Sequence, residues 1–267
     1  MSRTKVISLG FWLMLLAGFL VPVHALELGI SPPEIQIRVA PGDTYRGEII
    51  VFGSDTEPVD VLLSKTDWSL TTSGDYLMLP MGTVKRSASS WVSLASSQFR
   101  LPPKQGRRVQ YTIKAPPNIS GSYWTGIMFS TVSAPVSSKD KQVQIGMAGR
   151  IVYSVKIDVD GSLPKGNVER MRLKWDGESK KVLASLRVKN NGDSFIRFKG
   201  RLEIRDSQGR IANALPFEEG LVLPDSAREF SLKDYDFQFK PGFYVALAIA
   251  DLGDKSQKAV QSTLEIK

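Results

Sequence analysis

The chain has 267 residues, a formal net charge of +8, no cysteine and a single histidine, His24. Without cysteine and with so little histidine, it can form no disulfide framework, Ser-His-Asp triad, Cys-His dyad or ordinary zinc site. Its basic residues are scattered, whereas nucleic-acid binding calls for a basic stripe with interleaved aromatics. We therefore expect no enzyme of these classes, no cofactor, no metal site and no nucleic-acid partner, with at most weak attraction to an anionic surface.

The N-terminal segment, residues 1–25, has the pattern of a secretory signal peptide. Arg3 and Lys5 precede an apolar run from Ile7 to Val23, and Ala25 supplies a small residue at its exit. We expect cleavage before Leu26 and export to the periplasm, with the cell surface as the alternative. An uncleaved segment would instead be an N-terminal anchor. No later run reaches the roughly 18 apolar residues that span a bilayer, so stable membrane insertion is not expected after cleavage.

Residues 26–160 are predicted to form a first β-domain. Short apolar or alternating stretches are separated by turns rich in Pro, Gly and Ser, and none has a helical period of useful length. The weakly patterned stretch 70–90 predicts a loop with a short strand near 76–79. The other strands expected before residue 133 are 35–39, 45–52, 59–67, 91–94, 98–101, 108–114 and 123–132.

The longest extended stretch, Gln142 to Val159, closes this domain. Val143, Ile145 and Met147 alternate with polar or small residues, and the alternation continues beyond Gly149. At roughly 55 Å, the stretch is too long for one ordinary strand, so we expect a bend or bulge at the glycine. Two interpretations stay open. It is either the last strand of the domain, running into a linker, or a strand whose exposed first half binds a partner's strand.

Residues 161–267 repeat the plan after a polar Gly/Pro boundary. Strands are expected at 168–175, 182–188, 195–205, 230–239, 243–250 and 259–266. In each half a Leu-Pro pair and a Pro/Gly turn precede a tyrosine, Tyr123 or Tyr244. Such a tyrosine fits a tyrosine corner, in which the phenol bonds back to the turn before strand F of an immunoglobulin-like sandwich. The sequence therefore predicts an all-β protein with two tandem immunoglobulin-like sandwiches of about seven strands each.

Together, the signal segment, the two sandwiches and the long strand resemble the PapD-like periplasmic pilus (fimbrial) chaperones, most clearly over residues 26–159. Residues 143–151 look like that family's G1 strand, whose apolar side chains complete an unfinished pilin. The resemblance implies that Val143, Ile145 and Met147 contact a pilin-like or secreted subunit, and that Arg150 holds the carboxylate at its C-terminus. Guanidinium suits this task because it donates two parallel hydrogen bonds.

The chain departs from the family pattern at two places. Glu34 stands where the family has an arginine in the first strand, and the Tyr-Arg-Pro that closes G1 is missing. The main hypothesis is thus an exported, non-enzymatic binding protein that adds an extended segment to strand 142–151. The alternative is a structural or adhesive surface protein, with Trp91 or Trp124 as a glycan platform. Carboxylate-only glycoside hydrolysis is the least favoured hypothesis, because two such sandwiches supply no evident cleft.

Overall fold

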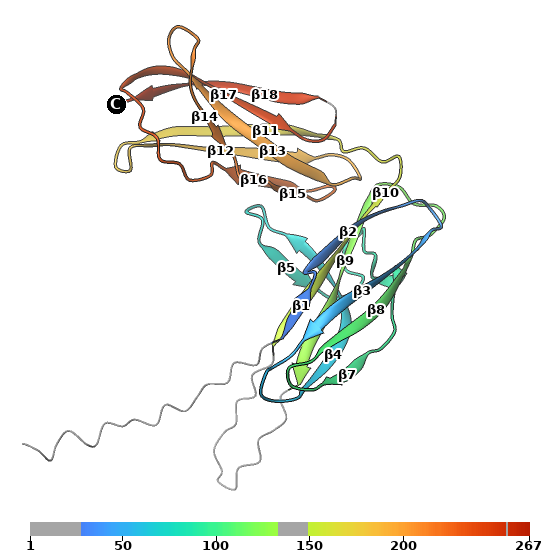
Figure 1. Ribbon diagram of the computed structural model, residues 1–267. Coiled ribbons are helices and arrows are strands. Elements are labelled where there is room, and N and C mark those ends of the chain that lie inside the picture. Colours follow the sequence, from blue (N-terminus) through green and yellow to red (C-terminus); the bar gives the residue numbers. More distant parts are fainter. Residues whose placement is uncertain (1–27, 133–148, 255) are drawn as a thin grey trace, which may run out of the picture.

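The computed structural model describes residues 28–132, 149–254 and 256–267. It contains two β-sandwiches that meet at an elbow (Figure 1), and this confirms the prediction of an all-β chain with two immunoglobulin-like sandwiches. The first pair of sheets ends at Val159 and the second begins at Gly166. In this described part, the single helical turn is Ser89–Trp91, and no helix has the length and apolar character needed to span a membrane.

The first sandwich packs a four-stranded sheet against a six-stranded one. The four-stranded sheet has the order β1 (Gly29–Ser31), β3 (Thr44–Phe52), β8 (Gly106–Lys114), β6 (Val92–Leu94). The six-stranded sheet has the order β2 (Glu34–Val39), β10 (Arg150–Val159), β9 (Ser122–Val132), β4 (Val59–Leu70), β5 (Tyr76–Leu79), and β7 (Gln98–Leu101) also pairs with β4.

The period-two patterns of the sequence define the core of the first sandwich. Along β4, the alternate residues Val59, Val61 and Leu63 are buried. Opposite them, β3 and β8 contribute Ile49 and Ile113, both completely buried. The apolar faces of the two sheets therefore close on one another and hold the sandwich without a disulfide.

The second sandwich packs a three-stranded sheet against a five-stranded one. The three-stranded sheet has the order β11 (Gly166–Asp176), β12 (Lys181–Asn190), β16 (Ala227–Ser231). The five-stranded sheet has the order β14 (Ile211–Pro216), β13 (Ile196–Arg205), β17 (Gly242–Asp251), β18 (Gln257–Ile266), and β15 (Gly220–Val222) also pairs with β13. In the core, the rings of Phe198 and Phe230 stack with centroids 4.1 Å apart.

Both sandwiches have more strands than the predicted seven or so. The first strand is divided at Pro32-Pro33 into β1 and β2, which join different sheets. A proline has no N–H to give to a ladder, so pairing ends there and resumes in the other sheet. The hairpin strand β5, expected near residues 76–79, adds a further edge to the six-stranded sheet.

Candidate functional site

The candidate site lies along β10, the strand that closes the six-stranded sheet beside β2. Antiparallel pairing with β9 covers Arg150 to Asp158, whereas parallel pairing with β2 begins only at Ser154, opposite Glu34. Tyr153, Val155 and Ile157 on β10 are completely buried in the first core. This part of the strand is therefore a fixed element of the sandwich.

The first residues of β10 form a free strand edge in the described part of the chain. The Gly149 carbonyl accepts from the Thr131 N–H of β9, and the Val159 N–H donates to the carbonyl of Gly121, just before β9, so the backbone bonds of odd-numbered residues face that strand. By the alternation of an antiparallel ladder, the N–H and C=O of Arg150 and Val152 point the other way, toward the β2 side. There β2 has not yet begun, because Pro33 supplies only a carbonyl, which accepts a bond from the Ser154 N–H. Two prolines thus leave backbone groups of β10 open to another strand.

Arg150 is the first residue of β10 and is exposed. It lies opposite Ser130 of β9 and four positions before Ser154, the residue paired with Glu34. Because Tyr153 points into the core, the period of two puts the Arg150 side chain on the outer face of the sheet. The other three predicted contact residues, Val143, Ile145 and Met147, lie outside the described residues.

Lys156 was missed by the sequence reasoning, which treated it only as a polar residue alternating with the apolar ones. Its ammonium group lies 2.5 Å from a carboxylate oxygen of Glu34, and its side chain is only 10% exposed. The Glu34 side chain is half exposed. This ion pair occupies the place where the resemblance implies a second cation, and the charge of Lys156 is balanced by Glu34. The contact depends on parallel pairing of β2 with β10, which residue spacing does not reveal.

On the same outer face of β10, the charged side chains nearer the elbow are already hydrogen-bonded to other residues of this chain. Asp158 accepts hydrogen bonds from Ser122 at 2.7 Å and from Arg197 of the second sandwich at 2.6 Å. Beside Lys156, the Ser154 hydroxyl is buried and has no hydrogen-bond partner among the described residues. The charges toward the elbow are thus paired within the chain, and the exposed cation of β10 is Arg150, at its other end.

Trp124 is not available as a glycan platform, because it is 5% exposed and packs between the two sandwiches. Its ring centroid lies 5.6 Å from that of Phe195, and its indole N–H donates to the Trp68 carbonyl at 2.6 Å. Trp91 is half buried against the first core, and its ring is tilted against that of Tyr123 with the centroids 4.5 Å apart. This burial contradicts the alternative in which Trp124 is a glycan platform, and the sequence alone does not tell which aromatic residues lie between domains.

The two tyrosines behave differently. The Tyr244 hydroxyl donates to the Lys240 carbonyl, four residues earlier, at 2.8 Å, which is the contact that defines a tyrosine corner. The Tyr123 hydroxyl makes no such bond within the described residues. Its ring packs between Trp91 and the Arg86 guanidinium, 5.2 Å from its centroid. Tyr123 is thus a packing residue of the first sandwich, and the expected corner is found only in the second.

No group of three His, Cys, Asp or Glu side chains in the described ranges is placed to hold a metal ion. The strongly perturbed groups of the first sandwich are buried tyrosines. Burial raises the pKa of both Tyr111 and Tyr153, whose hydroxyls lie 3.0 Å apart in the core. Being sealed in the core, they cannot reach a substrate and have a structural role.

No family model and no curated protein matches the sequence. The solved structures to which the chain is similar include fimbrial chaperones. They include the YadV chaperone (15% identity, 89% of this chain and 98% of that chain, TM-score 0.42). The Salmonella enterica SafA pilin in complex with the SafB chaperone matches at 12% identity over 90% and 97%, TM-score 0.43. The CsuC–CsuE complex of Acinetobacter baumannii matches at 11% over 88% and 97%, TM-score 0.43. The resemblance stated from the sequence is to the same kind of protein, and similarity at this level assigns no role to individual residues.

Proposed function

We propose that this chain is an exported, non-enzymatic chaperone-like protein that binds an extended segment of a pilin-like or secreted subunit by β-strand addition. The main support is the free edge at the start of β10, where Arg150 and Val152 pair with β9 on one side and, among the described residues, with no strand on the β2 side. An open row of N–H and C=O groups is a template for another strand. Natural sheets usually protect such an edge, and here two prolines keep it open.

The sequence directly before this edge supplies the specificity. Val143, Ile145 and Met147 recur with a period of two, so their side chains share one face of an extended segment. Backbone bonds of the added strand would provide affinity, and these three side chains would enter alternate pockets of the subunit. The basic start and apolar run of residues 1–25 support export to the periplasm, where such a subunit would be met.

The free cation at this end of β10 supports a contact between Arg150 and a carboxylate. Arg150 is exposed at the end of the strand away from the elbow, while Lys156 is occupied by Glu34. A guanidinium holds a carboxylate through two parallel bonds, which would fix the register of the added strand. The cation that binds the carboxylate would then be Arg150, at the start of β10, and not a residue beside Glu34.

A pull-down from the protein's own envelope extract tests the strand addition. The chain from Leu26 onward is compared with Val143→Asp/Ile145→Asp and with the matched control Gln144→Asp/Ala148→Asp, which adds the same charge to the opposite face. We expect one small partner to be retained by wild type and control and lost from the first variant. If a folded Val143→Asp/Ile145→Asp protein retains the same partner, strand addition at this segment is wrong. Equal loss from both variants would also contradict a face-specific contact.

The carboxylate contact is tested with the partner once it has been identified. Peptides of its C-terminal segment are prepared with a free carboxylate and with an amide. We expect Arg150→Ala to weaken binding of the free-carboxylate peptide about tenfold, the scale of one charge-assisted contact, and to leave the amide unaffected. Arg150→Lys should fall between, because lysine keeps the charge without the bidentate geometry. An equal loss for both peptides would rule out a carboxylate contact.

A further inference from the structure

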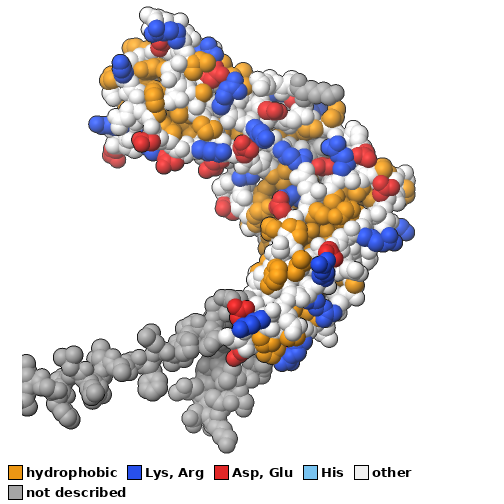
Figure 2. Space-filling model, viewed as in Figure 1, with side chains coloured by type: hydrophobic (Ala, Val, Ile, Leu, Met, Phe, Trp, Pro, Cys, Tyr) orange, Lys and Arg blue, Asp and Glu red, His pale blue; other side chains and the backbone are white. Residues whose placement is uncertain are grey.

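The outer face of the three-stranded sheet in the second sandwich carries a group of cations that the proposed function does not use. On β11, Met171 and Leu173 contact the core, so Arg170, Arg172 and Lys174 point outward. On β12 the buried residues alternate in the same way, which places Leu183, Ser185, Arg187 and Lys189 on this face. We call these seven outward residues of β11 and β12 the basic face. Figure 2 shows Lys and Arg, interspersed with Asp and Glu, around apolar side chains on this sandwich.

The charges of the basic face are only partly balanced. Arg187 pairs with Glu169 at 3.0 Å and Arg172 with Glu229 at 3.2 Å. Arg170 lies directly opposite Arg187 in the ladder, an arrangement of like charges that destabilises a sheet. The hydrogen bond from Ser185, and then the nearby charges of Arg172, Arg170 and Arg187, lower the pKa of Glu229. The Glu229 carboxylate therefore lies near three guanidinium groups, which outnumber it.

Two cations on β11 form no salt bridge in the described part of the chain, although each lies near a carboxyl group whose pKa is lowered by a serine hydrogen bond and then by its charge, Glu229 for the first and Asp176 for the second. They are Arg170 and Lys174, which are exposed and lie on either side of Arg172. Four residues along a strand separate their Cα atoms by roughly 13 Å. Their positive charges are therefore spread along the sheet, and no single small anion would reach both.

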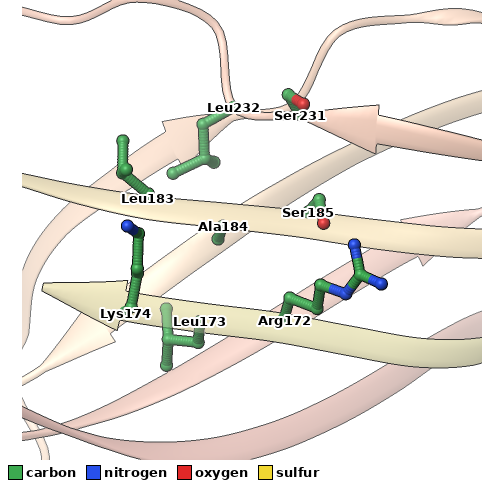
Figure 3. A pocket seen from close by; sticks show the side chains of 8 residues that line it. All are labelled: Arg172, Leu173, Lys174, Leu183, Ala184, Ser185, Ser231 and Leu232. Atoms are coloured by element: carbon green, nitrogen blue, oxygen red, sulfur yellow. The ribbon is translucent and has the colours of Figure 1, made fainter. Parts of the chain in front are cut away.

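Beside these cations the sheet is hollowed and apolar. A hollow of about 450 Å³ lies between Lys174 and Leu232, and Figure 3 shows the side chains around it. Leu183, directly opposite Lys174 in the ladder, is 41% exposed at this hollow. The Ser185 and Ser231 hydroxyls lie on the same rim. The face thus combines separated cations with an exposed leucine and two hydroxyl groups.

An extended peptide would find little free backbone to pair with over β12 and β16. Strand β12 is bonded on both sides, to β11 and to β16, so its backbone is already satisfied. At the far side of β16, the Glu229 N–H donates to the Thr72 carbonyl of the β4–β5 turn at 2.8 Å. A lipid bilayer needs no backbone partner, and its surface presents many phosphates side by side above an apolar layer.

From this arrangement we propose that the basic face docks on a bilayer surface rich in anionic phospholipid, with Arg170 and Lys174 at phosphate groups and Leu183 reaching the acyl boundary. The interaction is reversible, because a few cations and one leucine bind far less tightly than an inserted helix. A chain exported across a membrane meets such a surface. The docking is separate from the β10 edge, which lies on the other sandwich, so either proposal can fail alone.

Vesicle co-sedimentation tests this proposal with the chain from Leu26 onward, which retains both sandwiches and lacks the apolar N-terminal run. The vesicles contain phosphatidylglycerol and phosphatidylcholine in equal parts, or phosphatidylcholine alone. We expect binding to the anionic vesicles only, weakening as salt rises. Each cation near an anionic bilayer contributes about fivefold in affinity, so Arg170→Ser/Lys174→Ser should bind roughly 25-fold more weakly. Leu183→Ser should reduce the binding that remains at high salt.

The control variant Arg46→Ser/Lys114→Ser removes the same charge from exposed positions on the first sandwich. It should bind the vesicles as wild type does. Equal weakening by both double variants would show that only net charge matters and would overturn the docking face, as would an Arg170→Ser/Lys174→Ser protein that binds like wild type. Polyglutamate is the competing probe: if it binds through Arg170 and Lys174 while the anionic vesicles do not, the occupant is an acidic protein segment and the bilayer proposal is wrong.

Discussion

At the scale of single residues, the ion pair of Glu34 and Lys156 invites the most direct test. Lys156 is 10% exposed, so removing its carboxylate partner leaves a nearly buried charge. Glu34 is half exposed and water replaces part of the lost interaction, which reduces the effect. We expect Glu34→Gln to lower the free energy of unfolding by about 1–2 kcal/mol in urea denaturation.

The double variant Glu34→Gln/Lys156→Met provides the control for this prediction. Methionine fills a similar volume without a charge, so the double variant should recover most of the stability that Glu34→Gln loses. If Glu34→Gln has the unfolding midpoint of wild type, the ion pair contributes nothing to stability and the prediction is wrong.

The buried tyrosines predict how stability changes in alkali. The Tyr111 and Tyr153 hydroxyls share a bond of 3.0 Å, and burial raises the pKa of each above its ordinary value. In the unfolded chain they ionise near pH 10. The stability due to the neutral pair is thus fully present below about pH 10 and is lost as pH rises toward the folded-state values, by up to about 1.4 kcal/mol per pH unit for each tyrosine.

Urea denaturation from about pH 8 to about pH 11 measures this loss, and tyrosinate absorbance reports ionisation. In Tyr111→Phe/Tyr153→Phe, stability should fall less steeply above pH 10, although it starts lower because the buried hydroxyl bond is missing. If the free energy of unfolding falls equally steeply with pH in wild type and in the double variant, the loss of stability in alkali does not come from Tyr111 and Tyr153.

At the scale of elements, the open edge of β10 depends on which backbone groups already have partners. The Val152 N–H points away from β9, so proline at this position should be tolerated by the fold, as prolines are on edge strands. We expect Val152→Pro to remain folded by circular dichroism and to lose most of its partner binding, because it removes one ladder donor. Tyr153→Pro is the contrasting variant: it breaks a bond to β9 and should unfold the first sandwich.

The sequence pattern predicts where strands lie, but it does not predict how those strands are arranged in space. A period of two identifies strands such as β4, where Val59 and Val61 alternate with exposed residues. The strand β5 lies where a short strand was expected, at residues 76–79, although that stretch is only weakly patterned. Periodicity does not say which strands are neighbours. The pairing of Glu34 with Lys156 and the burial of Trp124 between sandwiches both come from the arrangement of strands in space. For this reason the sequence did not single out Lys156, whereas Arg150 was chosen through the family resemblance and its role stays a prediction.

At the scale of the whole molecule, the contacts at the elbow link the two sandwiches into one unit. Phe195 is 1% exposed and packs on Trp124, and its N–H donates to the Ser122 hydroxyl at 2.8 Å. A second link lies away from the linker, where the β4–β5 turn accepts the Glu229 N–H. Buried contacts of this kind couple unfolding of one domain to that of the other, so wild type should unfold in a single calorimetric transition.

Phe195→Ala tests this coupling. It removes a buried aromatic ring from the interface, and we expect a loss of about 3 kcal/mol together with two separate calorimetric transitions in place of one. Phe243→Ala is the matched control, because that ring is 74% exposed at the start of β17 and should change neither stability nor cooperativity. If Phe195→Ala still unfolds in one transition, the linker and the polar contacts suffice to couple the sandwiches. If wild type already shows two, the elbow is a hinge, and the β10 edge and the basic face would meet their partners independently.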